Sequence, residues 1–519
     1  MERHASESYY VPGEGLLAVS AGGRDSAPAA TPFRCSRMGP RGGGLDDRTT
    51  ELLAAAMAAG GGSGVEQTGV PAGYTYLGQF IAHDLSFDKT AVTLGANVSP
   101  AQLLQGTSPS LDLDSLYGAG PEDPASARFY AADAVHLKTG RTLAAGGRPE
   151  AEGFDLPRGA GSTVEERRTA VIPDERNDDN LAVAQTHLAF IRFHNRVVDS
   201  LPASVPDGLR FARARELVTK HYQWMVRTDY LPRICAQPVL DDVFENGRKV
   251  FEAGAEASAV PTMPLEFSVG TFRLGHSMVR SHYSWNRLRD TVTLRQLFES
   301  SAKGGDLGGH ERLPSTMIAD LRRLYDFGGA GRPDLAVPPA KLNLAMRIDT
   351  RLVARLRKLP PETFGGTDVP RGDPRANLAF RNLSRARMVK LAGGPQMADF
   401  LSERGVTLTR LSRAQLLEGE NGAGLDGFTA DRESALVEHA PLWFYILREA
   451  ECNGGRLDGV GARIVAETFH RAIEGSRWSI VRDPDWRPTL GPDATRFGMA
   501  ELLLFAFEEN PQLLAPLER

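Results

Sequence analysis

One histidine near the start of the chain stands in a pattern that could line a reactive pocket. The segment GQFIAHD at 78–84 contains Gln79 and His83, four residues apart, so on a helix their side chains share one face. Asp84 would point about 100° away and could serve a different site. The segment therefore suggests a polar pair in a pocket, beside a carboxylate that binds elsewhere. A surface helix with an ordinary histidine explains the same spacing.

A second pattern holds two carboxylates separated by one residue. Asp112 and Asp114 lie in LDLDSLYG at 111–118, and Ser108 and Ser110 precede them. Such a loop offers several oxygen atoms, and Ca²⁺ takes about six to eight oxygen ligands in a flexible arrangement. Asp and Ser also favour the first residues of helices, so a capped turn is the alternative explanation.

Two further segments each contain a candidate residue, one among acidic residues and one directly after a glycine. Arg176 lies among the acidic residues of DERNDDN at 174–180, which would also stabilise the start of the following helix. In FRLGH at 272–276, Gly275 directly precedes His276, and a glycine there would let a flat ligand approach the backbone closely. Both residues also have a purely structural explanation. Arg176 could form salt bridges, and His276 could be a histidine packed in the core.

The elements that must position these residues are helices. From Leu181 the sequence LAVAQTHLAFIRFHNRVVDSL repeats apolar residues at three- and four-residue spacing, which predicts an amphipathic helix. A second helix is predicted over Leu209–Arg227 and should end before Pro232. Period-two alternation is rare, so the sequence predicts a mainly α protein with long loops and little β structure. Further helices are predicted over Leu294–Ser300, Asn377–Leu391, Gln396–Arg404, Arg413–Glu418, Leu436–Asn453 and Ile464–Ile473.

Composition describes a large globular chain and excludes several classes of protein. The 519 residues carry 60 basic and 65 acidic side chains, a balance that argues against a dedicated nucleic-acid binder. Three distant cysteines exclude a disulfide scaffold and a CxxC zinc site, and the sequence has neither a GxxxxGK[ST] loop nor HExxH. No signal peptide or membrane-spanning segment is recognisable, so we expect a cytoplasmic protein, or one exported without a cleavable signal.

Taken together and in their order, these segments resemble the animal-type haem peroxidases of the peroxidase–cyclooxygenase superfamily, and their bacterial branch in particular. The matching segments are GQFIAHDLSFD at 78–88, LDLDSLYG at 111–118, RNDDN…HLAFIRFHNR at 176–196, DYLP at 229–232, FRLGH at 272–276, RNLSRAR at 381–387 and APLWFYILREAE from Ala440. Because they are spread so widely, we expect one large helical domain at 71–519, although the length alone suggests about three domains. A Gly/Ala/Pro-rich N-terminal arm at 1–70 should pack on or near it.

The resemblance implies a role for each matching residue. His83 would be the distal catalytic histidine, with Gln79 beside it, and Arg176 would be the distal arginine. His276 would be the proximal ligand of the haem iron, and Asn382 would accept the hydrogen bond from its ring N–H. The haem propionates would be held by two arginines, Arg273 and Arg385.

The resemblance also implies a calcium ion. Its ligands would come from one residue of the distal segment and four of the later loop, namely Asp84, Ser108, Ser110, Asp112 and Asp114. Because Asp84 adjoins the distal histidine, the cation would fix the helix that carries the catalytic base.

The chain departs from mammalian members of the family where those enzymes bind haem covalently. An ester-forming aspartate directly before the distal histidine is replaced by Ala82, which cannot form an ester. The second ester position is Asp179, one methylene shorter than the family's glutamate, and a methionine that forms a sulfonium link is replaced by Asn180. We expect haem b held mostly without covalent bonds, with Asp179 as the remaining ester position.

The activity that the resemblance implies is that of a haem peroxidase. It would reduce hydrogen peroxide through an oxidised haem intermediate and oxidise a small donor such as a halide, thiocyanate or a phenol. Such a protein would suit a bacterial response to oxidative stress, act as a monomer, and need neither membrane nor nucleic acid.

Two alternatives stay open. A fatty-acid dioxygenase of the cyclooxygenase or α-dioxygenase type has a radical-forming tyrosine three residues before the proximal histidine, where this chain has Arg273. The second alternative is a haem-binding module without turnover.

Overall fold

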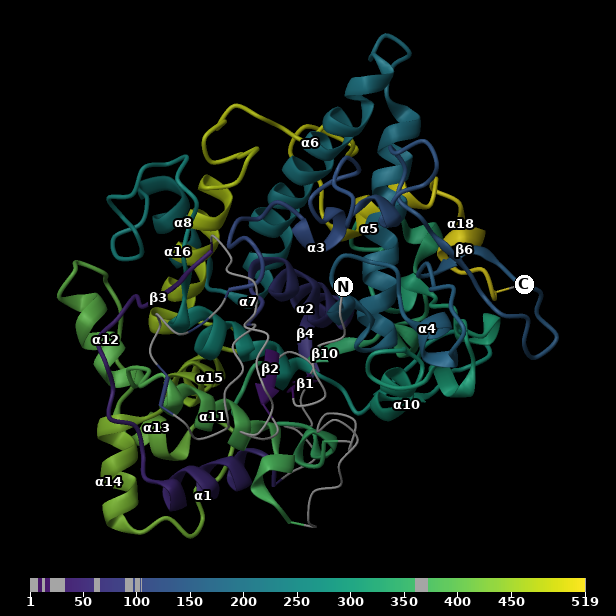
Figure 1. Cartoon of the computed structure of the whole chain (residues 1–519). Helices are drawn as coiled ribbons and strands as arrows, with labels where there is room; N and C mark the ends of the chain where they lie inside the picture. The colour runs from purple at the N-terminus through teal and green to yellow at the C-terminus, as the bar shows by residue number, and fades with distance from the viewer. Residues whose placement is uncertain are drawn as a thin grey trace.

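The computed structural model describes residues 8–11, 15–18, 33–59, 66–88, 97–98, 103, 105–359 and 372–518. Within them the chain is mainly helical and its strands form only two-stranded pairs (Figure 1), which confirms the predicted fold class. Much of the predicted arm at 1–70 lies outside the described residues. Among the residues that are described, no helix combines the length and apolar character that crossing a bilayer requires.

The α-helices follow one another along the whole described chain. They are α1 (Asp47–Met57), α2 (Gly73–Leu85), α3 (Asp114–Tyr117), α4 (Val164–Arg168), α5 (Leu181–Ser200), α6 (Asp207–Met225), α7 (Leu231–Ile234), α8 (Gln237–Asn246), α9 (Gly275–Met278), α10 (Leu294–Glu299), α11 (Leu378–Met388), α12 (Gly394–Ser402), α13 (Arg413–Glu418), α14 (Ala430–His439), α15 (Leu442–Cys452), α16 (Gly459–Glu474), α17 (Met499–Ala506) and α18 (Pro511–Leu514).

The strands are short and join segments that are often distant in sequence. The antiparallel pairs are β1 (Ser8–Val11) with β2 (Gly15–Ala18), β4 (Glu66–Pro71) with β10 (Leu344–Met346), β5 (Gly140–Arg141) with β6 (Glu152–Asp155), and β8 (His282–Tyr283) with β9 (Val292–Thr293). The parallel pair is β3 (Cys35–Ser36) with β7 (Met263–Pro264).

Helices α2 and α5 lie in the core, and α2 is buried almost all round, as is most of α5. Phe80 of α2 stacks on Phe190 of α5 with ring centroids 4.4 Å apart, and Tyr222 of α6 packs edge-on against both rings. Polar residues of α5, such as Gln185, Thr186 and His187, are buried as well, so α5 is more deeply buried than its amphipathic spacing predicts. This packing gives the candidate residues on and beside the two helices a rigid support.

The helix that was predicted to end before Pro232 continues past it. A π-helical turn, Val226–Tyr230, follows α6 directly, and α7 follows in turn with Pro232 as its second residue. The nitrogen of a proline near the start of a helix needs no hydrogen-bond partner, so Pro232 is accommodated there. The π turn places the Tyr230 hydroxyl in the space beside Gly78 of α2.

The single helix predicted over 436–453 is two helices, α14 and α15. The break falls at Pro441, and Ala440 before it has φ −49° and ψ 123°, outside the helical region. A proline ring disfavours helical geometry in the preceding residue, which explains the break. The buried helix α15 then reaches the candidate site, where the indole N–H of Trp443 donates to the backbone oxygen of Arg273 at 3.2 Å.

Residues 33–59 of the N-terminal stretch pack on the helical core. They contain α1, which the sequence did not predict and which is capped by the side chain of Asp46. The amide of Asn377 donates to the backbone oxygen of Ala54 at 2.9 Å, which joins α1 to the start of α11. Upstream of α1, the backbone N–H of Met38 donates at 2.8 Å to the buried carboxylate of Glu266.

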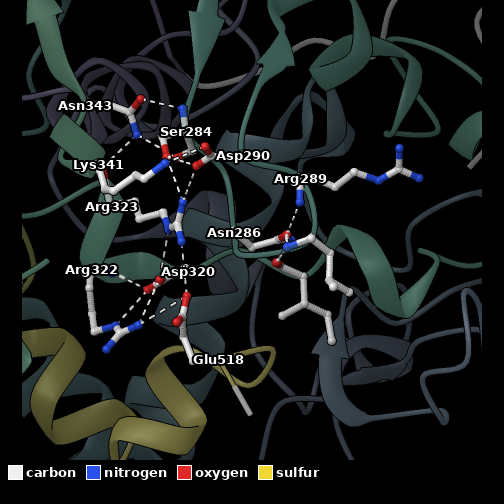
Figure 2. Close-up of polar contacts among 12 residues, drawn as sticks. Ser284, Asn286, Arg289, Asp290, Asp320, Arg322, Arg323, Lys341, Asn343 and Glu518 are labelled. Carbon is white, nitrogen blue, oxygen red and sulfur yellow. Dashed lines mark hydrogen bonds and ion pairs between the residues drawn. The ribbon is translucent and has the colours of Figure 1, made fainter. Parts of the chain in front are cut away.

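A network of charged side chains ties the C-terminal end to the segment 284–343 (Figure 2). Arg323 donates to Asp290 and Asp320 and, at 3.1 Å, to the carboxylate of Glu518. In the same region the buried amide of Asn286 donates to two backbone carbonyl oxygens at 3.0 and 2.8 Å. The residues of this network do not line the large cavity described below.

His221 of α6 is held in its neutral form by the backbone. Its Nδ1 lies 2.7 Å from the carbonyl oxygen of Leu217, while Nε2 accepts hydrogen bonds from the N–H groups of Thr489 and Leu490 at 2.9 and 3.1 Å. A carbonyl oxygen only accepts, so Nδ1 carries the hydrogen and Nε2 presents a lone pair. Burial lowers the pKa of His221 to about 4.

We expect the protein to lose stability between pH 7 and pH 5. The unfolded chain binds a proton at His221 near pH 6.5 and the folded chain only near pH 4, so acid favours unfolding in this interval. This residue alone should lower the free energy of unfolding by about 2 kcal/mol over those two pH units, measured by urea denaturation. His221→Gln should flatten the dependence, and His439→Gln at the exposed end of α14 should leave it unchanged. An identical slope in wild type and His221→Gln would contradict this assignment.

Candidate functional site

A cavity of about 1410 Å³, counting the space at its mouth, lies beside α2 and α9. Its walls include three residues that the sequence singled out: His83, Arg176 and His276. Apolar side chains make much of the remaining wall: Phe267, Phe272, Met278, Val279, Leu294, Phe298, Leu356, Leu359 and Leu378. The cavity therefore suits a mostly apolar ligand with a few polar groups.

His83 of α2 presents a base to this cavity. Its Nδ1 lies 2.9 Å from Oδ1 of Asn177, and its buried Nε2 has no hydrogen-bond partner within the described part of the chain. Burial, together with the nearby charge of Arg176, lowers the pKa of His83 to about 3. The ring is therefore neutral at ordinary pH and can accept a proton at Nε2.

Arg176 connects the end of α2 to the 3₁₀ turn Glu175–Asp178, which carries it. Its guanidinium donates to the carboxylate of Asp174 at 2.6 Å and to the backbone oxygens of His83 and Ser86, both at 2.7 Å. The ring of Phe87 lies 4.1 Å from the guanidinium carbon. Arg176 thus holds α2 against the turn while its positive charge lies in the cavity wall.

Gln79 lies one helical turn before His83 and also lines the cavity, as the sequence spacing predicts. Its side-chain oxygen accepts a hydrogen bond of 2.9 Å from the amide nitrogen of Asn180. The oxygen of the same Asn180 amide caps α5 by accepting from the N–H of Val183 at 3.0 Å. Asn180 therefore sets the orientation of Gln79, a role that the sequence analysis did not assign.

The side-chain amide of Asn382 on α11 turns its NH₂ group toward His276, the reverse of the predicted hydrogen-bond direction. Its Nδ2 lies 2.9 Å from Nδ1 of His276, and its Oδ1 accepts a hydrogen bond of 3.0 Å from the guanidinium of Arg273. A guanidinium has only donors, so it takes the amide oxygen and leaves the NH₂ group for the imidazole. The amide is the donor to the ring here, whereas the resemblance implied an acceptor.

Arg273 and Arg385 both line a smaller cavity of about 470 Å³ next to the first. Arg385 pairs with the carboxylate of Asp88 at 2.7 Å, and Arg273 lines the larger cavity as well. The two cavities share other wall residues too: Ser86, Arg176 and Ser268. The arginines that were predicted to hold the propionates therefore meet at one polar corner of the site.

Asp179 is fully buried in the wall of the larger cavity. Neither of its carboxylate oxygens has a hydrogen-bond partner within the described residues. Burial raises the pKa of Asp179 well above its ordinary value, against the opposing charge of Lys303. A buried carboxyl without a partner is costly, so this group points to a ligand that the cavity would hold.

The predicted calcium ligands are neighbours, but their carboxylates are bound to protein groups. Asp84 accepts from the backbone N–H groups of Leu113 and Ser115 at 3.1 and 3.2 Å. Asp112 accepts from one backbone N–H at 3.0 Å, and Asp114 pairs with Arg215 at 3.3 Å. Burial raises the pKa of Asp84 to about 8. Among the described residues, no group of three or more His, Cys, Asp or Glu side chains has a metal-holding arrangement.

The two serines of this predicted set turn their hydroxyls to the backbone. Ser110 donates to the carbonyl oxygen of Gly475 at 3.2 Å, and the Ser108 hydroxyl accepts from the N–H of Ser110 at the same distance. The loop therefore packs as a hydrogen-bonded turn against the end of α16.

Sequence reasoning missed Asn177 and His187. The amide nitrogen of Asn177 lies 3.0 Å from Nδ1 of His187, so one asparagine contacts two buried histidines. Neither residue was predicted to belong to the site. The sequence did contain one indication of Asn177: it directly follows Arg176, and adjacent residues of a tight turn can contact the same helix.

Two glycines of the cavity wall should respond oppositely to an added methyl group. A Cβ at Gly78 would lie 2.3 Å from the Tyr230 hydroxyl, whereas one at Gly275 would enter the cavity and meet no heavy atom of the described residues within 4 Å. Gly78→Ala should lower the free energy of unfolding by roughly 1–3 kcal/mol. Gly275→Ala should leave it unchanged or raise it by up to about 1 kcal/mol, because alanine favours a helix. Urea denaturation of both variants checks this, and equal losses would show that the space beside Gly275 is closed.

Comparisons with known proteins bear on what this site is. The family model described as animal haem peroxidase matches residues 70–321. This span contains His83, Arg176 and His276, whereas Asn382 and Arg385 lie beyond it.

Among curated proteins, the chain is similar to thyroid peroxidase. It is 25% identical to the protein of Rattus norvegicus over 405 residues and 25% identical to that of Mus musculus over 400 residues. Each match covers 73% of this chain and 39% of the relative. The chain therefore spans about two fifths of the length of these relatives.

Among solved structures, the chain is similar in fold to two kinds of protein. Peroxidase A from Dictyostelium discoideum has a TM-score of 0.57 at 14% identity, with 94% of each chain covered. Fatty acid alpha-dioxygenase from Oryza sativa has a TM-score of 0.56 at 11% identity, with 91% of this chain and 80% of that chain covered. These similarities show a shared fold. Residues 70–321, just under half of the chain, are thus similar to the animal haem peroxidase family, and the rest of the chain shares the fold of its members.

Proposed function

We propose that this protein is a haem peroxidase that reduces hydrogen peroxide and oxidises a small electron donor. The observation that carries the proposal is a pair of histidines from different helices that line one large cavity. His83 brings a neutral ring whose Nε2 has no partner within the described residues, and His276 brings a second ring from α9. A base on one helix and a candidate metal ligand on another are the two groups that a haem site needs.

The residues of the cavity suit haem b. Asn382 contacts Nδ1 of His276, which leaves Nε2 as the ring nitrogen that can bind iron. The apolar wall suits the porphyrin, and Arg273 and Arg385 at the smaller cavity suit its two carboxylates. If Nε2 of His276 held the iron, the remaining ring hydrogen would be on Nδ1, and the Asn382 amide would turn its oxygen toward the ring. Haem, when bound, supplies the electrons and the redox chemistry of the reaction.

The protein's own residues move the proton. His83 accepts a proton at Nε2 from one oxygen of hydrogen peroxide and returns it to the other, which departs as water. Such positioned acid–base work contributes about 10²- to 10⁴-fold in rate. Arg176 holds a permanent positive charge in the same wall and stabilises negative charge that develops on the peroxide oxygens. Gln79, oriented by Asn180, adds a polar group beside the base.

We also propose calcium at Asp84 and the loop 108–114. Three carboxylates come together there, and the charges of Asp114 and Asp112 both disfavour the ionised form of Asp84. A divalent cation would offset this repulsion, with Ser108 and Ser110 as further oxygen ligands. The site would secure the residue that directly follows His83.

The dioxygenase alternative requires a tyrosine three residues before the proximal histidine. Arg273 occupies the position three residues before His276. Tyr283 is buried and accepts a hydrogen bond of 2.7 Å from Tyr76, and it is not among the described residues that line the cavity. The arrangement around His276 therefore supports a peroxidase over a fatty-acid dioxygenase.

The purified full chain should take up haem and show an intense Soret band that changes when hydrogen peroxide is added. His83→Ala should keep the band and slow the change by about 10²- to 10⁴-fold, because the base is lost. His282→Ala, at an exposed residue of β8, is the matched control and should react at the wild-type rate. A Soret band that does not change with hydrogen peroxide would favour a haem-binding module without turnover, and absence of the band would contradict the proposal. Oxygen uptake with a fatty acid, at an unchanged peroxide rate in His83→Ala, would favour the dioxygenase.

Acid–acetone extraction should release most of the haem from the polypeptide. Ala82 cannot form an ester, and the short side chain of Asp179 is the one remaining attachment point. Any haem that stays with the wild-type chain should be released from Asp179→Ala, while Glu175→Ala, at a partly exposed residue of the same turn, should retain as much as wild type. Haem retained by Asp179→Ala would show a bond to a different residue.

A further inference from the structure

We infer that Asn177, oriented by His187, is a positioning residue that sets which ring nitrogen of His83 carries the hydrogen. This inference deepens the proposed function, because it concerns the residue assigned there as the base. The three side chains form one buried chain of hydrogen bonds from the cavity wall into the core. Neither Asn177 nor His187 lines the cavity within the described residues, so both would act through His83.

The contacts of the Asn177 amide determine the hydrogen positions on both rings. Oδ1 lies 2.9 Å from Nδ1 of His83, and Nδ2 lies 3.0 Å from Nδ1 of His187. A carbonyl oxygen only accepts, so Nδ1 of His83 carries the hydrogen and Nε2 keeps its lone pair. An amide NH₂ only donates, so Nδ1 of His187 is unprotonated and its hydrogen is on Nε2, a buried nitrogen without a hydrogen-bond partner among the described residues.

The opposite amide orientation would give a ring that cannot work as a base. The NH₂ group would then face His83, whose hydrogen would move to Nε2 and block that nitrogen as a proton acceptor. His187 would in turn need its hydrogen on Nδ1. The tautomers of the two histidines are therefore coupled through one asparagine, and a general base at His83 requires the arrangement that the structure has.

Each member of this chain is held by a different element. Asn177 sits in the 3₁₀ turn Glu175–Asp178, and its backbone N–H donates to the carbonyl oxygen of Asp174 at 3.1 Å. The neighbouring Arg176 donates to the backbone oxygen of His83, which keeps this turn against α2. His187 lies on α5 with its ring edge-on to Phe80, at 5.8 Å between centroids. All three polar side chains are fully or almost fully buried, so water does not compete for the amide.

The tautomers can be read directly from the nitrogen chemical shifts of the ¹⁵N-labelled full chain. The spectra are recorded without haem and with haem in the reduced, carbon monoxide form, which is diamagnetic. We expect His83 with hydrogen on Nδ1 and His187 with hydrogen on Nε2 in both samples. A wild-type His83 with hydrogen on Nε2 would overturn the inference, whether or not the protein proves to be a peroxidase.

Variants separate positioning from simple loss of stability. Asn177→Ala should yield a mixture of His83 tautomers and slow the reaction with hydrogen peroxide by about tenfold. His187→Phe keeps the ring shape but removes the acceptor that orients the amide, so we expect a smaller loss in the same direction. Asn177→Asp retains an acceptor for Nδ1 of His83 and should restore its tautomer. The matched control is Asn286→Ala, which removes a buried asparagine of the network region in Figure 2.

The outcomes distinguish this inference from the proposed function. Asn177→Ala with a pure Nδ1–H tautomer and the full peroxide rate would overturn the inference while leaving the peroxidase assignment intact. An equal loss of rate in Asn286→Ala would show that the effect is general destabilisation, and would overturn it as well. Failure of the wild type to bind haem would remove the proposed function, while the spectra of the haem-free chain would still decide the tautomer.

Discussion

The site depends on one buried interaction, the contact of the Arg176 guanidinium with the end of α2. Its donors reach the backbone oxygens of His83 and Ser86, and the carboxylate of Asp174 balances its charge. Breaking a buried pair of this kind by removing one partner costs about 3–5 kcal/mol. The contact therefore does more than add charge to the cavity, because it determines where the whole turn lies.

The residues that follow Arg176 take their places from this contact. Asn177 reaches His83, Asp179 lies in the cavity wall, and Asn180 caps α5 while it orients Gln79. A 3₁₀ turn directs successive side chains in different directions, so one short segment serves the base, the ligand space and the next helix. The charge of Arg176 also contributes to keeping His83 neutral, which a proton acceptor requires.

On the side of the cavity that carries His276, one side chain again contacts two residues of the site. The guanidinium of Arg273 takes the oxygen of Asn382, and the remaining NH₂ group takes the imidazole. The residue that suits a ligand carboxylate is therefore connected to the candidate iron ligand through a single amide. A carboxylate that drew Arg273 away would free the amide oxygen for His276, so binding at the two positions would be linked.

Some of this arrangement could be predicted from residue spacing, and some could not. Gln79 and His83 share a helical face because four residues make about one turn, and this prediction needs no tertiary contact. Helix ends were harder to predict. Pro232 was predicted to stop a helix but lies at a helix start, because a π turn precedes it, whereas Pro441 breaks a helix that was predicted to be continuous. The orientation of the Asn382 amide depends on the guanidinium of Arg273, which is 109 residues away in sequence.

By itself the sequence determined the helical character of the chain, the order of its motifs and the types of side chain available for proton transfer and iron binding. These follow from local periodicity and from residue chemistry. Only the tertiary structure decided that His83 and His276 line one cavity, that Asp179 is buried there without a partner among the described residues, and that His187 reaches the base through Asn177. The reason is physical: hydrogen-bond direction and burial depend on atoms brought together from distant segments, and local sequence does not specify those contacts.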